Sequence, residues 1–166
     1  MELQNEIKKE NQIVSDWLLH YHDRLAEYEQ HKSEIAVYPG QALSDEIRAE
    51  GISDPTHRAA LKMQGFKYNP EWFLLVEELE RRIPEKQRIF LQVRREARNN
   101  HSNYRGRPGW VAYVQCKYPL VMAERTGKDI EKFYIGHPNT YTGWWNRLVE
   151  AAVRMAIERR LIRKKY

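Results

Sequence analysis

Residues 4–35 form a long stretch without glycine or proline, and their apolar side chains recur at helical spacing. The five central members of this row are separated alternately by four and three residues, and one further member lies seven residues beyond each end, which places all of them on one face of a long amphipathic helix. We expect this coiled-coil-like face either to pair with a second copy of the chain, giving a homodimer through residues 4–35, or to pack on the chain's own domain. The row consists of Ile7, Val14, Leu18, Tyr21, Leu25, Tyr28 and Ile35.

Glycines and prolines divide the remaining chain into shorter segments that also have helical character. Short helices are predicted at 42–50 and 55–64, and further helices after Asn69-Pro70 and after Pro84, because a polar cap and a proline are typical of a helix start. The alternation with period two that marks strands is confined to residues 133–135. The pattern predicts an all-α fold.

The polar segment 99–109, which contains both glycine and proline, divides the chain into two regions. Residues 1–98 are expected to form a helical region that dimerises or binds a partner. Residues 110–166 have the layout of a helix-turn-helix DNA-binding domain. We expect a supporting helix over 110–126, interrupted near Pro119 and ended by Gly127, and a final helix over 139–160. Arg159 and Arg160 stand where a glycine ordinarily closes such a helix.

Charge is distributed unevenly between these regions. From residue 105 to the end there are 13 Lys and Arg side chains against 5 Asp and Glu, a local net charge of +8, whereas residues 1–104 carry −3. A basic stretch that also contains patterned helices indicates a surface for a polyanion. The alternative is a solubilising basic tail.

The sequence contains no pattern that indicates catalysis, a cofactor or a metal site. Its six histidines lack metal-ligand spacing, and Cys116 is the single cysteine. Glu77, Glu78 and Glu80 are interpreted as the solvated side of a helix. No apolar run approaches the ~18 residues of a membrane span, and the first residues lack the apolar core of a secretory signal. We therefore expect a cytoplasmic protein that is not an enzyme.

The final helix has two distinct faces when its residues are placed at 100° intervals. The predicted core face carries Tyr141, Trp145, Leu148, Val149, Ala152 and Ala156. The opposite face carries Asn139, Thr140, Gly143, Asn146, Arg147, Glu150 and Arg154. Trp144 lies on the flank, and we interpret both tryptophans as packing against the preceding helix. The polar face is either a DNA-reading surface or an ordinary solvated one.

Particular side chains on the polar face suit particular parts of a duplex. Arg147 could donate to a guanine edge, and Asn146 could pair with adenine. Thr140 and the first N–H groups of the helix suit a phosphate oxygen, and Gly143 would allow a close approach of the backbone. The full set of candidate DNA contacts adds Asn139, Thr142 and Arg154 on this helix, and Arg105, Arg107, Lys117, Arg125, Lys128 and Lys132 around it as phosphate contacts.

Three parts of the chain together resemble phage and prophage transcription regulators of the RinA/ArpU/Xpf type. The first part is the N-terminal helix with the later SDPTHRAAL. The second is the pair of segments WFLLVEELERRIP and EKQRIFLQVRREA. The third is RPGWVAYVQCKYPLVMAERTGKD together with NTYTGWWNRLVEAAVRMAIERRLI. The resemblance implies a helix-turn-helix like region 4 of sigma factors, with residues 120–126 on the supporting helix and 140–147 on the recognition helix. Twelve residues, 128–139, replace the usual tight turn of three or four, so we expect a turn enlarged by an extra half-turn or a small wing.

The resemblance implies a function as well as a fold. It implies an activator of phage late or packaging genes that acts in the cytoplasm of a bacterial host, with double-stranded DNA and host RNA polymerase as its partners. Two alternatives remain open at this stage. One is a DNA-packaging recognition subunit like a small terminase, and the other is a helical adaptor that binds only protein.

Overall fold

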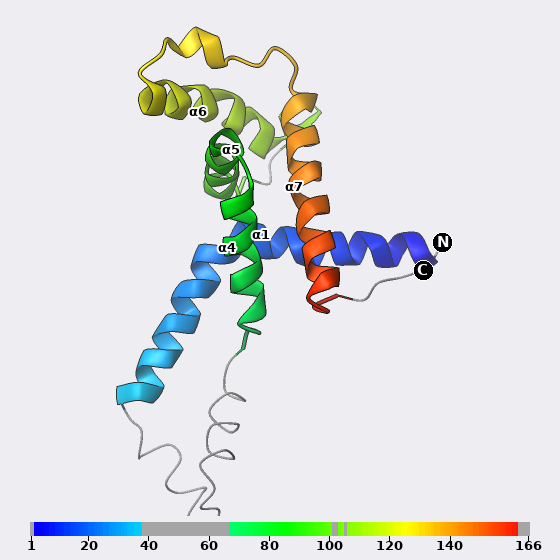
Figure 1. Ribbon diagram of the computed structural model, residues 1–166. Coiled ribbons are helices and arrows are strands. Elements are labelled where there is room, and N and C mark those ends of the chain that lie inside the picture. Colours follow the sequence, from blue (N-terminus) through cyan, green and yellow to red (C-terminus); the bar gives the residue numbers. More distant parts are fainter. Residues whose placement is uncertain (1, 38–66, 101–102, 105, 163–166) are drawn as a thin grey trace, which may run out of the picture.

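The residues that the structure describes form an all-helical fold with one short hairpin, and the all-α class is as the sequence predicts. The structure is a computed structural model that describes residues 2–37, 67–100, 103–104 and 106–162 (Figure 1). The short helices predicted at 42–50 and 55–64 lie outside the described residues. The main elements are the helices α1 (Glu2–Val37), α4 (Glu71–Arg82), α5 (Glu85–Glu96), α6 (Gly109–Thr126) and α7 (Asn139–Glu158).

Helix α1 covers the long amphipathic stretch, with a kink at His20, where φ is −103° and ψ is 16°. Val14, Leu18 and Tyr21, from the centre of the apolar row, are buried in the chain's own core. Leu25 and Tyr28 are half-buried against the same core. Of the two expectations for this row, packing on the chain's own domain is therefore the one that the structure shows for its central part.

Helices α4 and α5 begin at the places that the sequence predicts. The backbone N–H of Glu71 donates to the side-chain oxygen of Asn69 at 3.0 Å, so Asn69 satisfies one of the otherwise unpaired donors of the first turn of α4. The backbone of Pro84 is extended, so the helical conformation of α4 does not continue through this residue and α5 starts in a new direction. Both helices bury one apolar side.

The segment predicted as a linker contains a small hairpin. Strands β1 (Asn103–Tyr104) and β2 (Arg107–Pro108) pair antiparallel, and Gly106 in the turn has a φ of 74°. Helix α6 follows directly and ends at Gly127, which takes a left-handed conformation, as predicted. The interruption predicted near Pro119 is wrong, because α6 continues through this residue. Pro119 cannot donate a backbone hydrogen bond to the preceding turn. The burial of Tyr118 and Met122 on either side of the proline explains how the helix tolerates this loss.

The connector between α6 and α7 contains a short 3-10 helix, η1 (Ile130–Phe133). Of the two expectations for this enlarged connector, an extra half-turn or a small wing, this helical segment corresponds to the first. The strand considered at 133–135 is wrong: Phe133 ends η1, and none of residues 134–138 pairs as a strand. Phe133 and Ile135 are half-buried against the core, which accounts for their apolar character without a sheet.

One hydrophobic core connects the regions on both sides of 99–109. Helix α5 packs on α6, while α7 packs on α1 and α4, and buried residues of all five helices form a single cluster. Aromatic rings are prominent in it, with Trp17 stacked on Trp72 at 5.2 Å and Phe90 stacked on Tyr141 at 6.1 Å between ring centroids. The polar segment 99–109 therefore does not separate two independent cores.

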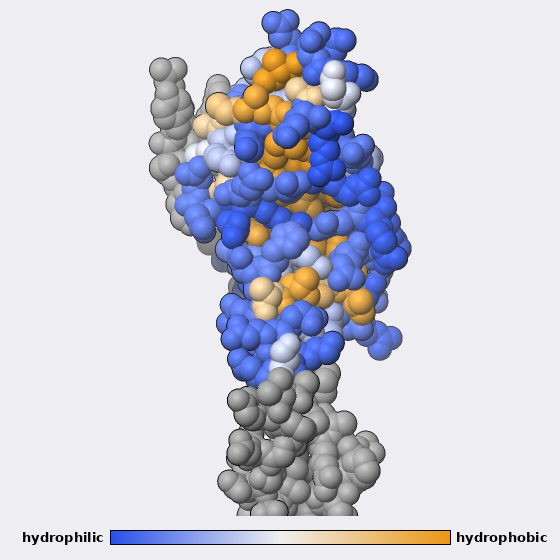
Figure 2. Space-filling model, turned by 90° about the vertical axis from the view of Figure 1, so that its left-hand side faces the viewer, coloured by the Kyte–Doolittle hydropathy of each residue, from blue (hydrophilic) through white to orange (hydrophobic). Residues whose placement is uncertain are grey.

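Figure 2 shows the side of the molecule on which α6 ends and η1 lies, and this face is mainly hydrophilic, with apolar residues gathered toward its upper end. The chain around these elements contributes several half-buried apolar side chains and the half-exposed Leu120. Figure 1 shows α7 on the opposite side of the molecule, so its outer surface is a separate face.

Candidate nucleic-acid interface

Helix α7 separates its apolar and polar residues as the sequence predicts. All six residues of the predicted core face are buried: Tyr141, Trp145, Leu148, Val149, Ala152 and Ala156. On the other face, Asn139, Asn146, Arg147, Glu150 and Arg154 are exposed, while Thr140, Thr142 and Gly143 are half-buried. The polar side of the helix is thus open to solvent along its length.

The two arginines of this face are not committed to partners within the described chain. Neither Arg147 nor Arg154 forms an ion pair or hydrogen bond with any described residue, although Glu150 lies on the same face. Their side chains project from a rigid, well-packed helix. An arginine held in this way keeps all five N–H donors available for an acceptor such as a phosphate or a guanine edge.

The first turn of α7 is less open to an anion than the sequence indicates. No side chain caps it, but the N–H of Thr140 donates to the carbonyl oxygen of His137 at 3.1 Å, and that of Tyr141 to the carbonyl oxygen of Pro138 at 3.2 Å. These N–H groups are therefore already paired within the turn. The predicted role of Thr140 in holding a phosphate would fall mainly to its hydroxyl group.

Gly143 lies in the middle of the open face. A β-carbon added at this position would meet no other atom within 4 Å, so packing inside the described protein does not require a glycine here. Glycine in a helix interior costs about 1 kcal/mol relative to alanine. The residue therefore weakens α7 without a compensating contact among the described residues.

The two tryptophans of α7 pack inward, and Trp144 contacts the preceding helix, as expected. Trp144 makes edge-to-face contacts with Phe90 and Tyr118, whose ring centroids lie 5.5 and 5.6 Å away. Lys86 places its amine 4.9 Å from the centre of the Trp144 ring, at the rim of this cluster. The start of α7 is thus held against both α5 and α6.

The basic residues predicted around the motif do not gather on one surface with α7. Lys117 and Arg125 are exposed on α6, Lys128 follows that helix, and Lys132 lies in η1. Figure 1 shows the end of α6 and η1 on the side of the molecule away from α7. Arg105 lies outside the described residues, and Arg107 lies in β2, where only its backbone is described. The structure brings together Asn139, Thr140, Thr142, Gly143, Asn146, Arg147 and Arg154, which share one helix.

Helices α6 and α7 do not form a tight pair. Helix α6 packs mainly on α5 and η1, whereas α7 packs mainly on α1 and α4. In Figure 1, α6 extends away from α7, and the connector returns across the top of the molecule to the start of α7. The predicted helix-turn-helix is therefore not confirmed as a compact unit.

The glutamates of α4 contact other helices: Glu77 is exposed, as its interpretation as part of a solvated side requires, whereas Glu78 and Glu80 are half-buried. Glu77 accepts a hydrogen bond from the Tyr21 hydroxyl at 3.1 Å. Glu78 forms an ion pair with Arg159, near the end of α7, and Glu80 pairs with Arg95 of α5 at 2.6 Å. Spacing along one helix could not predict these pairings, because each of them joins two different helices.

Arg94 is a buried cation that the sequence analysis missed. Its guanidinium carbon lies 4.2 Å from the ring centre of Trp110 and 4.8 Å from that of Trp145, and no carboxylate among the described residues pairs with it. Burial lowers the pKa of this guanidinium to about 10, so the group still carries its charge at neutral pH. The two indole faces stabilise that charge and join α5 to α6 and α7.

Neither a metal site nor a membrane span is found in the part of the chain that the structure describes. No three His, Cys, Asp or Glu side chains there are arranged to hold a metal ion. None of its helices combines the length and the apolar character needed to cross a bilayer. Comparison of the chain with protein-family models, curated proteins and solved structures found no match.

Proposed function

We propose that the protein is a sequence-specific DNA-binding transcription regulator that reads DNA with the outer face of α7. The observation that carries this proposal is the exposure of Asn146, Arg147 and Arg154 on one open helix face, with the arginines unpaired among the described residues. The opposite face is buried over the same length, which fixes the helix firmly. An exposed helix of this kind can enter the major groove of B-DNA.

Each residue of the face has a distinct role in the proposal. Arg147 donates to a guanine edge and Asn146 pairs with adenine, since these residue types match those base edges. Arg154, two turns further along, contacts a phosphate and sets the register of the helix. Gly143 lets the helix backbone approach the floor of the groove more closely than a residue with a side chain would.

The proposal keeps the regulatory context that the resemblance implies: a phage-encoded regulator in a bacterial cytoplasm, with host RNA polymerase as a partner. It assigns no dimer contact to the central apolar row of α1, because Val14, Leu18 and Tyr21 are buried within the chain. If the regulator binds as a dimer, another surface must make the contact. Ile7 and Ile13 are exposed apolar side chains near the start of α1.

The central test compares Arg147→Ala with Arg81→Ala after selection of bound duplexes from a random library. Arg81 is a matched control, because it is exposed on α4 and forms no ion pair with a described residue. We expect Arg147→Ala to cost about 1–3 kcal/mol and to relax the preference at one base position. A loss that is small and equal on all sequences would contradict base reading. No binding to any duplex at low salt would overturn the whole proposal.

A second test uses Gly143→Ala, which separates stability from DNA binding. Because the added methyl group meets open space, we expect the substitution to stabilise the free protein by about 1 kcal/mol. The same methyl group should weaken binding to the selected duplex if the backbone lies close to DNA. Unfolding in denaturant and a fluorescence-anisotropy titration measure the two effects. Equal or tighter DNA binding by this variant would exclude the close approach.

A further inference from the structure

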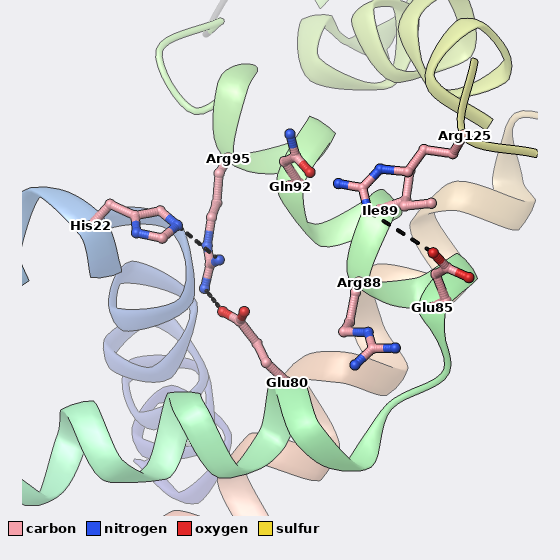
Figure 3. A pocket seen from close by; sticks show the side chains of 8 residues that line it. All are labelled: His22, Glu80, Glu85, Arg88, Ile89, Gln92, Arg95 and Arg125. Carbon is pink, nitrogen blue, oxygen red and sulfur yellow. Dashed lines mark hydrogen bonds and ion pairs between the residues drawn. The ribbon is translucent and has the colours of Figure 1, made fainter. Parts of the chain in front are cut away.

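A pocket of about 380 Å³ has no residue of α7 in its lining, and the proposed DNA contact makes no use of it. Helices α1, α4, α5 and α6 all contribute to its wall, so its shape depends on the folded core (Figure 3). Its volume falls within the range of small-molecule sites. The lining residues are His22, Glu80, Glu85, Arg88, Ile89, Gln92, Arg95 and Arg125.

The charged groups of the inner wall of the pocket already contact one another within the protein. Arg95 donates from Nε to the carbonyl oxygen of Leu18 at 2.8 Å, and its two terminal nitrogens lie 3.3 Å from Nε2 of His22 and 2.6 Å from a carboxylate oxygen of Glu80. Figure 3 shows the Arg95 side chain turned toward these two partners. This arginine has little capacity left for a ligand, and its role is to build the wall.

The outer wall, in contrast, offers donors that are weakly used. Arg88 forms no ion pair or hydrogen bond with a described residue. Arg125 reaches Glu85 only at 3.9 Å, and both side chains are more than half exposed, at 54% and 65%. An exposed pair of this kind contributes about 0–1 kcal/mol, so a stronger acceptor can displace it. The amide of Gln92 adds a further donor on the same helix as Arg88.

From this arrangement we infer that the pocket binds a small molecule through a phosphoryl group, which is held by Arg88 and Arg125. Two guanidinium groups from different helices present more N–H donors than the two oxygens of one carboxylate can accept at good geometry. A tetrahedral phosphoryl group offers three oxygens in three directions, and can therefore accept from both arginines and from Gln92. The inference does not depend on the proposed DNA binding.

The ligand would bridge α5 and α6, because Arg88 and Arg125 belong to these two helices. At the pocket these two helices are already joined by the long pair between Arg125 and Glu85. On binding, the phosphoryl group takes the place of Glu85 as the acceptor of Arg125. Glu85 then turns into solvent, where its charge is hydrated.

The test is a calorimetric titration of the full chain with pyrophosphate, in the wild type and in Arg88→Gln, Arg125→Gln and the control Arg81→Gln. We expect saturable binding to one site, weakened about tenfold or more by each of the first two substitutions and unchanged by the third. All three side chains are exposed, so the variants should keep the wild-type helical circular-dichroism spectrum. Absence of saturable binding in the wild type, or an equal loss in Arg81→Gln, would overturn the inference.

A competition experiment distinguishes a free small molecule from the phosphate backbone of DNA. A short random duplex is added to the pyrophosphate complex, and the same duplex is titrated against Arg88→Gln and Arg125→Gln. If the pocket serves a small molecule, the duplex does not displace pyrophosphate, and the two variants bind DNA like Arg81→Gln. Displacement together with a specific loss of DNA affinity in both variants would show that the site holds backbone phosphates and would overturn the small-molecule assignment.

Discussion

Arg160 has the backbone conformation that glycine usually takes at the end of a helix. Its φ is 57°, in the left-handed region. The N–H of Arg160 donates to the carbonyl oxygen of Ile157 at 3.0 Å, and the N–H of Leu161 donates to that of Ala156 at 2.8 Å. These two bonds form a Schellman motif, which satisfies carbonyl groups at the end of α7. A residue with a β-carbon is strained in this position by roughly 1–2 kcal/mol.

We predict that Arg160→Gly stabilises the protein. Removal of the β-carbon relieves the backbone strain, and the expected gain is about 1 kcal/mol in the free energy of unfolding, measured in denaturant. Arg160→Ala is the control, because it removes the charge but keeps the β-carbon. An equal gain in the alanine variant would attribute the effect to charge and contradict the conformational explanation.

Arg94 shows how far single residues can be predicted from spacing. It lies four residues after Phe90 and three before Ala97, so the helical pattern already places it on the buried side of α5. The pattern does not show what stabilises the charge there, because Trp110 and Trp145 come from two other helices. Local periodicity determines which residues face inward, whereas the partner of a buried cation depends on the tertiary packing.

At the scale of elements, the kink in α1 is the feature that most depends on contacts between helices. The kink lies at His20, and the carbonyl oxygen of Leu18 accepts a hydrogen bond from Nε of Arg95 at 2.8 Å. Arg98 holds the carboxylate of Asp23, just beyond the kink, with two nitrogens at 3.1 and 3.2 Å. A side chain inserted into the helical hydrogen-bond ladder is a recognised cause of such bends.

We predict that Arg95→Met destabilises the protein by about 2–3 kcal/mol, because the change leaves Glu80 without its partner and the Leu18 carbonyl oxygen without its donor. This loss is smaller than the ~3–5 kcal/mol typical of breaking a fully buried ion pair, since the Glu80 side chain is about a third exposed, at 32%. Denaturant unfolding measures the loss.

The double variant Arg95→Met with Glu80→Met serves as the internal control for this prediction. It removes the unpaired carboxylate, so part of the lost stability should return. Arg81→Met gives the reference for an exposed arginine. If Arg95→Met costs no more than Arg81→Met, the hydrogen bond to Leu18 does not hold the kink.

Most helices could be predicted from the sequence, because their signals are local. Asn69-Pro70 and Pro84 mark the starts of α4 and α5, and Gly127 marks the end of α6. The kink in α1 could not be predicted, since its cause, Arg95, lies 77 residues away from Leu18 in the chain. The charged pocket escaped prediction for the same reason: its lining residues come from four helices.

The candidate site on the polar face of α7 could be predicted in part from the sequence. Its residues could be named in advance because the helical wheel separates them from the apolar row, and their exposure depends only on that separation. The arrangement of α6 and α7 could not be obtained in this way. Helix α6 makes its main contacts with α5 and η1 rather than with α7, and these contacts join residues from separate segments of the chain.

At the scale of the whole molecule, the single core links the basic C-terminal region to the rest of the chain. Helix α7 packs on α1 and α4, and Arg159 ties its end to Glu71 and Glu78 of α4. A surface on α7 is therefore supported by the entire fold. The linker predicted at 99–109 changes the direction of the chain through a hairpin, but cooperative unfolding should include both sides of it.

The pH dependence of stability provides a test of this cooperativity. Burial raises the pKa of Tyr21, Tyr118 and Tyr141 to about 12 from the ordinary value of 10, with Glu77 adding to the effect at Tyr21. Between these values the unfolded chain loses its tyrosine protons while the folded chain keeps them. The stabilising contribution is therefore complete below pH 10 and is lost as the pH rises through about 12.

We predict a single alkaline unfolding transition between about pH 10 and 12, in which helical circular dichroism and the absorbance of newly ionised tyrosine change together. Each of the three tyrosines contributes up to about 3 kcal/mol, because its pKa is raised from 10 in the unfolded chain to about 12 in the folded one. The three tyrosines belong to α1, α6 and α7, so we expect the helices that share this core to unfold together. Two separate transitions would contradict a core shared across residues 99–109.

The variant Tyr141→Phe tests the contribution of a single buried tyrosine to this alkaline unfolding transition. The Tyr141 hydroxyl is buried and has no hydrogen-bond partner among the described residues, so its removal should cost little or no stability at neutral pH. The same removal eliminates one group whose ionisation opposes folding, and the alkaline midpoint should move to higher pH. Tyr21→Phe is the contrasting variant, because it breaks the hydrogen bond to Glu77 and should lower neutral stability by about 1 kcal/mol. An unchanged alkaline midpoint in Tyr141→Phe would mean that ionisation of this buried hydroxyl does not limit the fold.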